Sequence, residues 1–126
     1  MPKSVPALVS APKPLAPYSV ATEANGFVFI SGQVAIDTSG GHTPDGAGDQ
    51  ARLVLDNIGR ILGDLGLAYS DVVKTTIFLA DVADFGIVNE VYGSYWGDQP
   101  PARSTIQAGA LPRPEFKVEI EAIAAR

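Results

Sequence analysis

The sequence predicts an α+β fold in which five strands and two helices follow one another in the order ββαβαββ. Two segments repeat apolar residues at helical spacing, and five shorter segments rich in β-branched or aromatic residues are bounded by glycine, proline or Asn-Gly. We therefore expect one mixed sheet with both helices on one face. The 126 residues contain no internal repeat, charge block or low-complexity linker, so we expect a single domain over residues 17–126.

Residues 1–16 precede the first predicted strand. They contain a lysine and a short apolar run, as a signal peptide does, but Pro6, Pro12 and Pro14 interrupt that run. We expect an extended N-terminal arm instead. No later segment approaches the roughly 20 apolar residues that a membrane span requires. The prediction is a soluble, cytoplasmic protein without a membrane partner.

A hairpin is the first predicted unit. Residues 17–24 form one strand, Asn25-Gly26 is a two-residue turn signal, and residues 27–30 form a second strand that runs into Ser31-Gly32-Gln33. The sequence Phe-Val-Phe-Ile at 27–30 is apolar on both faces, which a soluble monomer rarely exposes. Either the strand assignment is wrong or one face packs against another subunit. We favour the oligomer, because a sheet face has to be buried against something.

A helix is predicted next, beginning between Asp45 and Asp49 and ending at Gly66. Its apolar residues recur at helical spacing: Ala51, Val54, Leu55, Ile58, Ile61, Leu62 and Leu65. Residues 72–79 are rich in β-branched side chains and indicate the third strand.

The second predicted helix spans about residues 81–96, and Pro100-Pro101 follows it. One face of this helix carries Phe85, Val88, Tyr92 and Tyr95. The last two strands are predicted at 102–107 and 116–124, separated by a segment that contains glycine and two prolines.

Composition excludes several kinds of chemistry. The chain has no cysteine, which removes disulfides, thiolate nucleophiles and cysteine metal sites. The only histidine, His42, lies in a glycine-rich loop, so neither a histidine metal site nor a catalytic triad is expected. The net charge is −5 and the nine basic residues are scattered, which argues against nucleic-acid binding. We predict no metal site.

Arg103 and Glu119 are the side chains on which catalysis is expected to rest. Arginine holds a carboxylate through two parallel hydrogen bonds, and Arg103 opens the strand at 102–107. Glu119 lies in the alternating segment Phe116–Ala122. On neighbouring strands, the pair would hold an acidic substrate beside a base. A structural ion pair, or a solvated strand face for Glu119, explains the same pattern.

Four further residues are weaker candidates. Gly32 permits close backbone approach, so the amides of Ser31-Gly32 can donate to a ligand, although a plain bulge or turn explains the pair equally. Asn89 interrupts the apolar side of the second helix, where it lines a site or caps a neighbouring backbone group. Tyr18 carries no distinctive signal by itself.

Several segments together resemble the RidA/YjgF family of enamine/imine deaminases. They occur in the family's order and cover nearly the whole chain beyond the arm: Ala16-Pro17-Tyr18-Ser19, Ile30-Ser31-Gly32-Gln33, Leu55-Asp56-Asn57-Ile58, Val73-Lys74-Thr75-Thr76-Ile77-Phe78, Val88-Asn89-Glu90-Val91-Tyr92, Pro101-Ala102-Arg103-Ser104 and Val118-Glu119-Ile120-Glu121-Ala122. Each segment alone is a weak signal, and the set is specific.

The resemblance implies a chorismate-mutase-like α+β fold and a homotrimer with ligand sites between subunits. It also implies hydrolysis of reactive 2-enamino and 2-imino acids, such as 2-aminoacrylate and 2-iminopropionate, to 2-keto acids and ammonia without a cofactor. The expected partners are therefore small imino, enamino or keto acids and further copies of the chain. Hydrolysis of this kind needs an anchored carboxylate, an oriented water and a proton for the leaving nitrogen.

Matching positions imply roles for single residues. Arg103 matches the arginine that grips the substrate carboxylate, and Glu119 matches the acid that positions or activates water. The other matching positions line the same pocket and are expected to bind substrate: Tyr18, Ser31, Gly32, Asn89 and Thr105. This chain departs from the family at three positions, with Thr105 in place of a frequent cysteine, Ala16 in place of glycine and Val20 in place of glutamine.

Other functions stay open from the sequence. A non-catalytic protein that binds small carboxylates would need Arg103 but no base beside it, so Glu119 favours the enzyme. Endoribonuclease or chaperone activity, both attributed to the family, is a third hypothesis. The acidic charge balance and the lack of an aromatic and basic stripe weigh against RNA binding.

Overall fold

The computed structural model describes residues 2–11, 13–14 and 16–126. Its elements follow the predicted order: β1 (Ala21–Ala24), β2 (Phe27–Val34), α1 (Ala47–Asp64), β3 (Val72–Leu79), α2 (Phe85–Gly93), β4 (Ala102–Gln107) and β5 (Val118–Ala125). Short 3-10 turns at Tyr69–Asp71 and Val82–Asp84 precede β3 and α2. The predicted third strand matches β3 at both ends, and the first predicted helix begins within the expected range.

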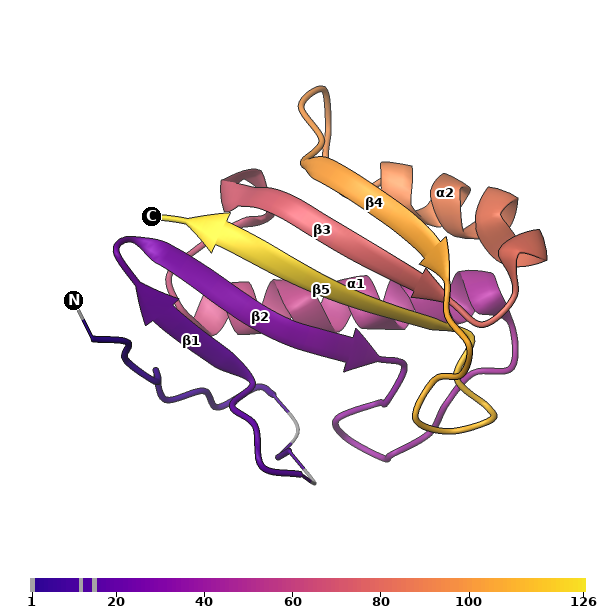
Figure 1. Ribbon diagram of the computed structural model, residues 1–126, viewed down its shortest axis with the longest axis horizontal. Helices are drawn as coiled ribbons and strands as arrows, with labels where there is room; N and C mark the ends of the chain where they lie inside the picture. The colour runs from indigo at the N-terminus through magenta and orange to yellow at the C-terminus, as the bar shows by residue number, and fades with distance from the viewer. Residues whose placement is uncertain (1, 12, 15) are drawn as a thin grey trace.

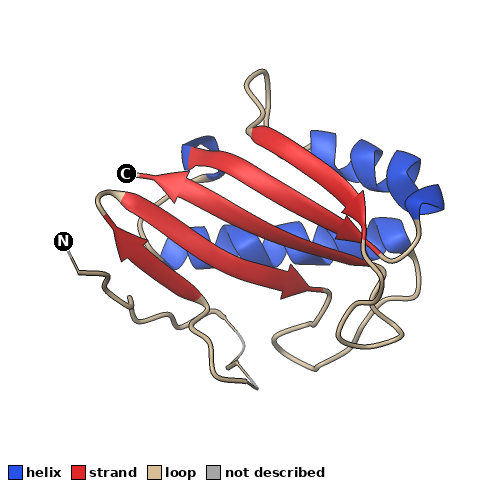
Figure 2. Ribbon diagram, viewed as in Figure 1, coloured by secondary structure: helices blue, strands red, loops and turns tan. Residues whose placement is uncertain are grey.

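The strands form one mixed sheet in the order β1-β2-β5-β3-β4. β3 and β4 are parallel, and the other neighbours are antiparallel. Both helices lie on the same side of the sheet, behind it in Figures 1 and 2. The α+β class, the mixed sheet and the two helices on one face are therefore confirmed.

The core lies between α1 and the sheet. α1 has its apolar residues at helical spacing, and its inward face packs on β2 and β5. Side chains with no exposed surface fill this layer: Val54, Leu55, Ile58, Ile61, Leu62, Val28, Ile77, Val118 and Ile120. α2 packs against α1 and covers the sheet near β4 (Figure 1).

A buried glutamine connects α1 to the segment that leads into β5. Gln50 has no exposed surface, and its Nε2 donates to the carbonyl oxygens of Pro44 and Glu115 at 2.8 and 2.9 Å. Its Oε1 accepts from the backbone N–H of Lys117 at 2.8 Å. These bonds satisfy backbone groups of the segments that precede α1 and β5. They also hold the chain two residues before Glu119.

The face of the sheet opposite the helices carries exposed apolar side chains. In β2, Val28 and Ile30 are buried beneath the helices, whereas Phe27 and Phe29 on the other face are 45% and 44% exposed. Ile106 on β4 is 50% exposed. The strand at 27–30 is thus apolar on both faces, as predicted. Within the described part of the chain, no helix covers this open face (Figure 2).

The first strand is shorter than predicted. The prediction covered residues 17–24, but β1 begins only at Ala21. Residues 16–20 instead form a bent segment, because the N–H of Tyr18 donates to Ala16 O at 2.8 Å. Ser31 holds the same segment: its N–H donates to Val20 O at 2.8 Å and its Oγ to Ser19 O at 2.6 Å.

The N-terminal segment runs beside the domain. Ser4 pairs with Glu23 through two backbone hydrogen bonds of 2.9 Å, next to β1. Farther along, Asp64 at the end of α1 accepts from the N–H groups of Val9 and Ser10 at 3.1 and 2.8 Å. Positions 1, 12 and 15 of the predicted arm lie outside the described residues. No helix in the described ranges is long and apolar enough to cross a membrane.

Candidate functional site

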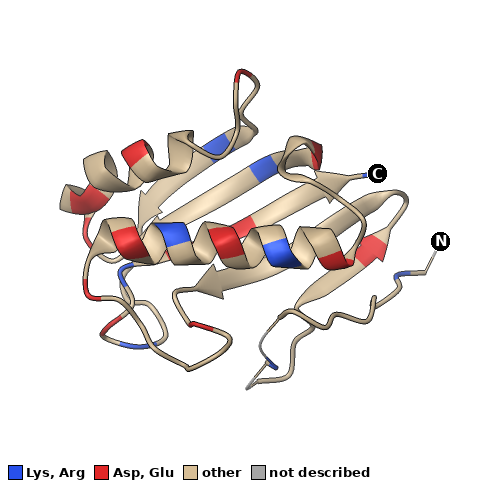
Figure 3. Cartoon of the chain, turned by 180° about the vertical axis from the view of Figure 1, so that it is seen from behind, with Lys and Arg blue, Asp and Glu red and all other residues tan. Residues whose placement is uncertain are grey.

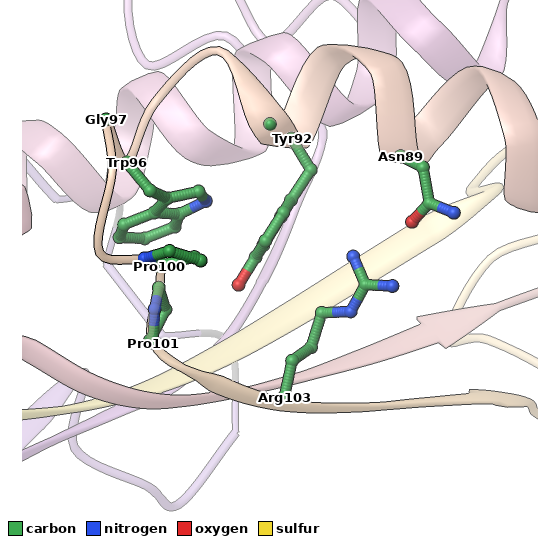
Figure 4. Close-up of a pocket in the computed structure, with 8 residues that line it drawn as sticks. Asn89, Tyr92, Trp96, Gly97, Pro100, Pro101 and Arg103 are labelled. Carbon is green, nitrogen blue, oxygen red and sulfur yellow. The ribbon is translucent and has the colours of Figure 1, made fainter.

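Arg103 lies on the helix side of β4, beneath α2. Its Cζ is 4.9 Å from the centre of the Tyr92 ring, and its guanidinium group points toward Asn89 (Figure 4). These residues border a cavity of about 470 Å³ that Trp96, Pro100 and Pro101 also line. We call Arg103, Asn89 and Tyr92 the arginine cluster.

Arg103 is available to bind an anion. Among the residues that the structure describes, ion pairs join Arg113 to Glu115 and Arg126 to Glu23, and none involves Arg103. The structural ion pair considered from the sequence is therefore not found within the described chain. A half-buried guanidinium group is suited to a carboxylate, which it can hold through two parallel hydrogen bonds.

Asn89 and Thr105 differ in whether they border the cavity beside Arg103. Asn89 borders the same cavity as Arg103. Thr105 is two residues beyond Arg103 and shares its face of β4, but it does not border the cavity. Its Oγ1 is buried and has no hydrogen-bond partner among the described residues.

Glu119 lies on the open face of the sheet, above Gly32. The pairing of β2 with β5 shifts between Ile30 and Gln33, which marks an irregularity at Ser31-Gly32. A Cβ atom at Gly32 would lie 2.9 Å from Glu119 Cδ and closer still to Oε2. Glycine is therefore needed for the carboxyl group to lie against this part of β2. The group that approaches the backbone at Gly32 is the Glu119 side chain.

Tyr18 and Ser31 border a second cavity, of about 580 Å³, on the same open face. Phe29, Thr22 and Glu121 also line it, and Lys3 reaches it from the N-terminal segment. Tyr18 is 52% exposed, because the bend at residues 16–20 turns it outward. Gly32 and Glu119 do not line this cavity, but Gly32 follows Ser31 in β2 and Glu119 lies against Gly32. We call Tyr18, Ser31, Gly32 and Glu119 the glutamate cluster.

The surroundings of Glu119 favour its protonated form. Partial burial raises the pKa of this carboxyl group above its ordinary value, and the charge of Glu121 raises the pKa further. A raised pKa makes a carboxylate a stronger base and moves it toward the range in which general acid-base catalysis is efficient.

Arg103 and Glu119 do not meet within one chain, which corrects a sequence-based expectation. They were expected on neighbouring strands, but β3 separates β4 from β5. Arg103 is paired with Thr75 on β3, and Glu119 is paired with Phe78, three positions away and on the opposite face. The arginine cluster faces the helices, whereas the glutamate cluster faces away from them. A site that uses both clusters requires a second chain.

Gly32→Ala tests the close approach of Glu119. The Gly32 φ angle is not in the left-handed region, so alanine introduces no backbone strain, and the new methyl group displaces only the end of a flexible side chain. We expect a melting temperature within a few degrees of the native value and a loss of activity of about tenfold or more. Gly63→Ala on α1, where a Cβ meets nothing within 4 Å, is the control that should keep full activity.

Sequence reasoning missed the role of Tyr92. It was assigned only to the apolar face of the second helix, but its ring lies against the Arg103 side chain. The spacing of Phe85, Asn89 and Tyr92 places all three on one side of α2, which indicates that they belong together. Glu121 was likewise assigned only to a strand face, although it borders the open-face cavity.

The sequence matches the family described as endoribonuclease L-PSP over residues 8–126. The chain therefore belongs to this family, which is the RidA/YjgF family that the motifs indicated. The described residues contain no group of three or more His, Cys, Asp or Glu arranged to hold a metal ion.

Individual relatives carry more specific names. The chain is 45% identical over 123 residues to a Mus musculus protein named 2-iminobutanoate/2-iminopropanoate deaminase, covering 97% of this chain and 90% of that one. It is 49% identical to the chloroplastic Reactive Intermediate Deaminase A of Arabidopsis thaliana, covering 97% of this chain and 65% of that protein. Among solved structures, E. coli TdcF with bound serine aligns with a TM-score of 0.87 and 38% identity, covering 93% of this chain and 94% of that chain.

Proposed function

We propose that this protein is a cofactor-independent deaminase that hydrolyses 2-imino and 2-enamino acids to 2-keto acids and ammonia. The observation that carries this proposal is Arg103, a half-buried cation that borders a cavity and forms no ion pair among the described residues. The names of the mouse and plant relatives support the same reaction class. The reacting carbon of a 2-imino acid is bonded to a carboxylate, so an arginine that holds the carboxylate also places that carbon.

Glu119 is the proposed general base and acid. It takes a proton from water as the water oxygen bonds to C2, the electrons of the C=N double bond move to nitrogen, and Glu119 returns the proton to that nitrogen. Glu119 then takes the proton of the new hydroxyl group and passes it to the nitrogen. The C–N bond breaks as C=O forms, and its electron pair leaves with ammonia. One imino acid and one water give one keto acid and one ammonia. The raised pKa of Glu119 supports both proton transfers.

The complete site forms between subunits in this proposal. Arg103 and Glu119 lie on opposite faces of the sheet, so the arginine cluster of one subunit meets the glutamate cluster of the next. The exposed Phe27, Phe29 and Ile106 on the open face support an interface there, because monomers rarely leave such a face in water. We propose a homotrimer, the assembly that the family resemblance implies.

The charge distribution favours a small substrate over nucleic acid. Along α1, Arg52 and Arg60 alternate with Asp49, Asp56 and Asp64, and Figure 3 shows no basic stripe along that helix. Sequence-independent binding to nucleic acid depends on clustered Lys and Arg. The ribonuclease in the family's description is therefore not the activity that these surfaces support best.

The direct test generates short-lived imines and follows keto-acid release. An amino-acid oxidase produces 2-imino acids that hydrolyse slowly in buffer, and we expect catalytic amounts of this protein to accelerate the release of keto acid and ammonia together. The rate should be proportional to protein concentration. A rate equal to that of buffer with serum albumin, for imines of small and large amino acids alike, would contradict the proposal.

The oligomeric state provides a separate test. Light scattering coupled to size exclusion at micromolar concentration should give three chains per particle. The apolar side chains of the open face need a partner, and the family resemblance implies a trimer. A monodisperse monomer that still deaminates imines would show that one chain holds the whole site. That outcome contradicts both the interface and the shared use of Arg103 and Glu119.

A further inference from the structure

The guanidinium group of Arg103 lies close to two aromatic side chains of α2. Its Cζ is 4.9 Å from the ring centre of Tyr92 and 5.8 Å from that of Phe85. The two aromatic residues are seven positions apart, which is two helical turns, so they project from the same side of α2. A guanidinium group within about 6 Å of an aromatic face is attracted to it and is restricted in rotation.

Tyr92 is itself held rigidly. Only 4% of its surface is exposed, and its hydroxyl group lies 2.6 Å from Thr75 Oγ1, which is buried as well. The Trp96 ring packs on it with 5.2 Å between ring centres. Tyr92 thus borders the cavity with little exposed surface, and its hydroxyl group is already hydrogen-bonded to Thr75.

Thr75 connects Tyr92 to the part of the sheet that carries Arg103. It lies directly opposite Arg103 in the pairing of β3 with β4, and both side chains face α2. The hydrogen bond from Thr75 to Tyr92 therefore fixes the tyrosine ring relative to the strand that carries Arg103. Figure 4 shows the outcome, with the arginine beside the tyrosine ring and its terminal nitrogens directed toward Asn89.

We propose that Phe85 and Tyr92 are positioning residues that set the plane of the Arg103 guanidinium group, and that Thr75 holds Tyr92 for this purpose. The proposal rests on the function proposed above, because the ligand of Arg103 is taken to be a carboxylate. The two rings select a bidentate carboxylate, since they leave the N–H edge of the guanidinium group free and limit the angles that it can adopt.

The test measures binding of pyruvate, a keto acid, against binding of pyruvamide, its uncharged analogue. Phe85→Leu and Tyr92→Leu remove an aromatic face and keep apolar bulk. We expect the Kd for pyruvate to rise about three- to tenfold in each, the usual range for a lost cation–π contact, with little change for pyruvamide. Tyr92→Phe, which keeps the ring, should recover most of the affinity that Tyr92→Leu loses. Tyr95→Leu removes a nearby ring that does not contact Arg103 and is the control.

The outcomes separate this inference from the proposed function. If Arg103→Lys weakens pyruvate binding but Phe85→Leu leaves it unchanged, Arg103 binds the carboxylate without help from the rings and the inference is wrong. Phe85 is 41% exposed, so its replacement is tolerated even if Tyr92→Leu fails to fold. Equal losses for pyruvate and pyruvamide would indicate a general packing defect and would also overturn the inference. If the unaltered protein binds no keto acid, the proposed function fails and the inference fails with it.

Discussion

Glu119→Gln is expected to lower turnover on 2-imino acids by about 100-fold or more, the usual range for the loss of a general base. Glutamine has nearly the same shape and fits against Gly32, but it cannot accept a proton from water. Carboxylate ligands should still bind, because Arg103 lies in the other cluster. Partial burial already disfavours the ionised form of Glu119, so the neutral side chain should not destabilise the fold.

The measurement pairs turnover with ligand binding on the same sample. Glu115→Gln makes the same chemical change at an exposed carboxylate whose ion pair with Arg113 spans 3.9 Å, and it should leave both quantities unchanged. If Glu119→Gln turns over imines at the native rate, another group activates the water. If it loses ligand binding together with turnover, Glu119 acts in binding and the assigned base is wrong.

Local patterns in the sequence predict most of the fold. The spacing of apolar residues in α1 and the β-branched run of β3 reflect burial along a single element, so they locate each element without reference to its neighbours. The start of the first strand was predicted four residues too early. The N–H of Tyr18 bonds to Ala16 O, and the side chain of Ser31, in a different strand, bonds to Ser19 O, so the chain before residue 20 is bent, and no local pattern encodes the contact with Ser31.

The arrangement of the site depends on long-range pairing that the sequence pattern does not contain. Each candidate residue was identified by type and by position on its own element, but the order of the strands decides which of them meet. β5 enters between β2 and β3, which brings Glu119 to Gly32 and places β3 between it and Arg103. Alternation along a strand gives the face of a residue relative to its neighbours only. That Arg103 and Glu119 lie on opposite faces of the sheet therefore could be seen only once the strand pairing was known.

Arg103→Lys is expected to retain the fold and the oligomer and to lose activity by roughly ten- to a hundredfold. Lysine keeps the positive charge but loses the planar fork that fixes the angle of a carboxylate as well as its distance. A charge-assisted hydrogen bond of this type contributes about 1.5–3 kcal/mol, which corresponds to that range. Arg52→Lys on the exposed face of α1 is the matched control, with no expected loss of activity.

Mixing the Arg103→Lys protein with the Glu119→Gln protein tests the shared site. If each site takes Arg103 from one subunit and Glu119 from the next, trimers assembled from equal amounts of the two variants contain native sites. The chance is one half for each residue, so about a quarter of the sites should be native and activity should recover to about a quarter of the native level. Sites that lie within one chain would give no recovery on mixing. If Arg103→Lys alone turns over imines at the native rate per folded protein, Arg103 is not part of the site. The main physical argument for deamination then fails.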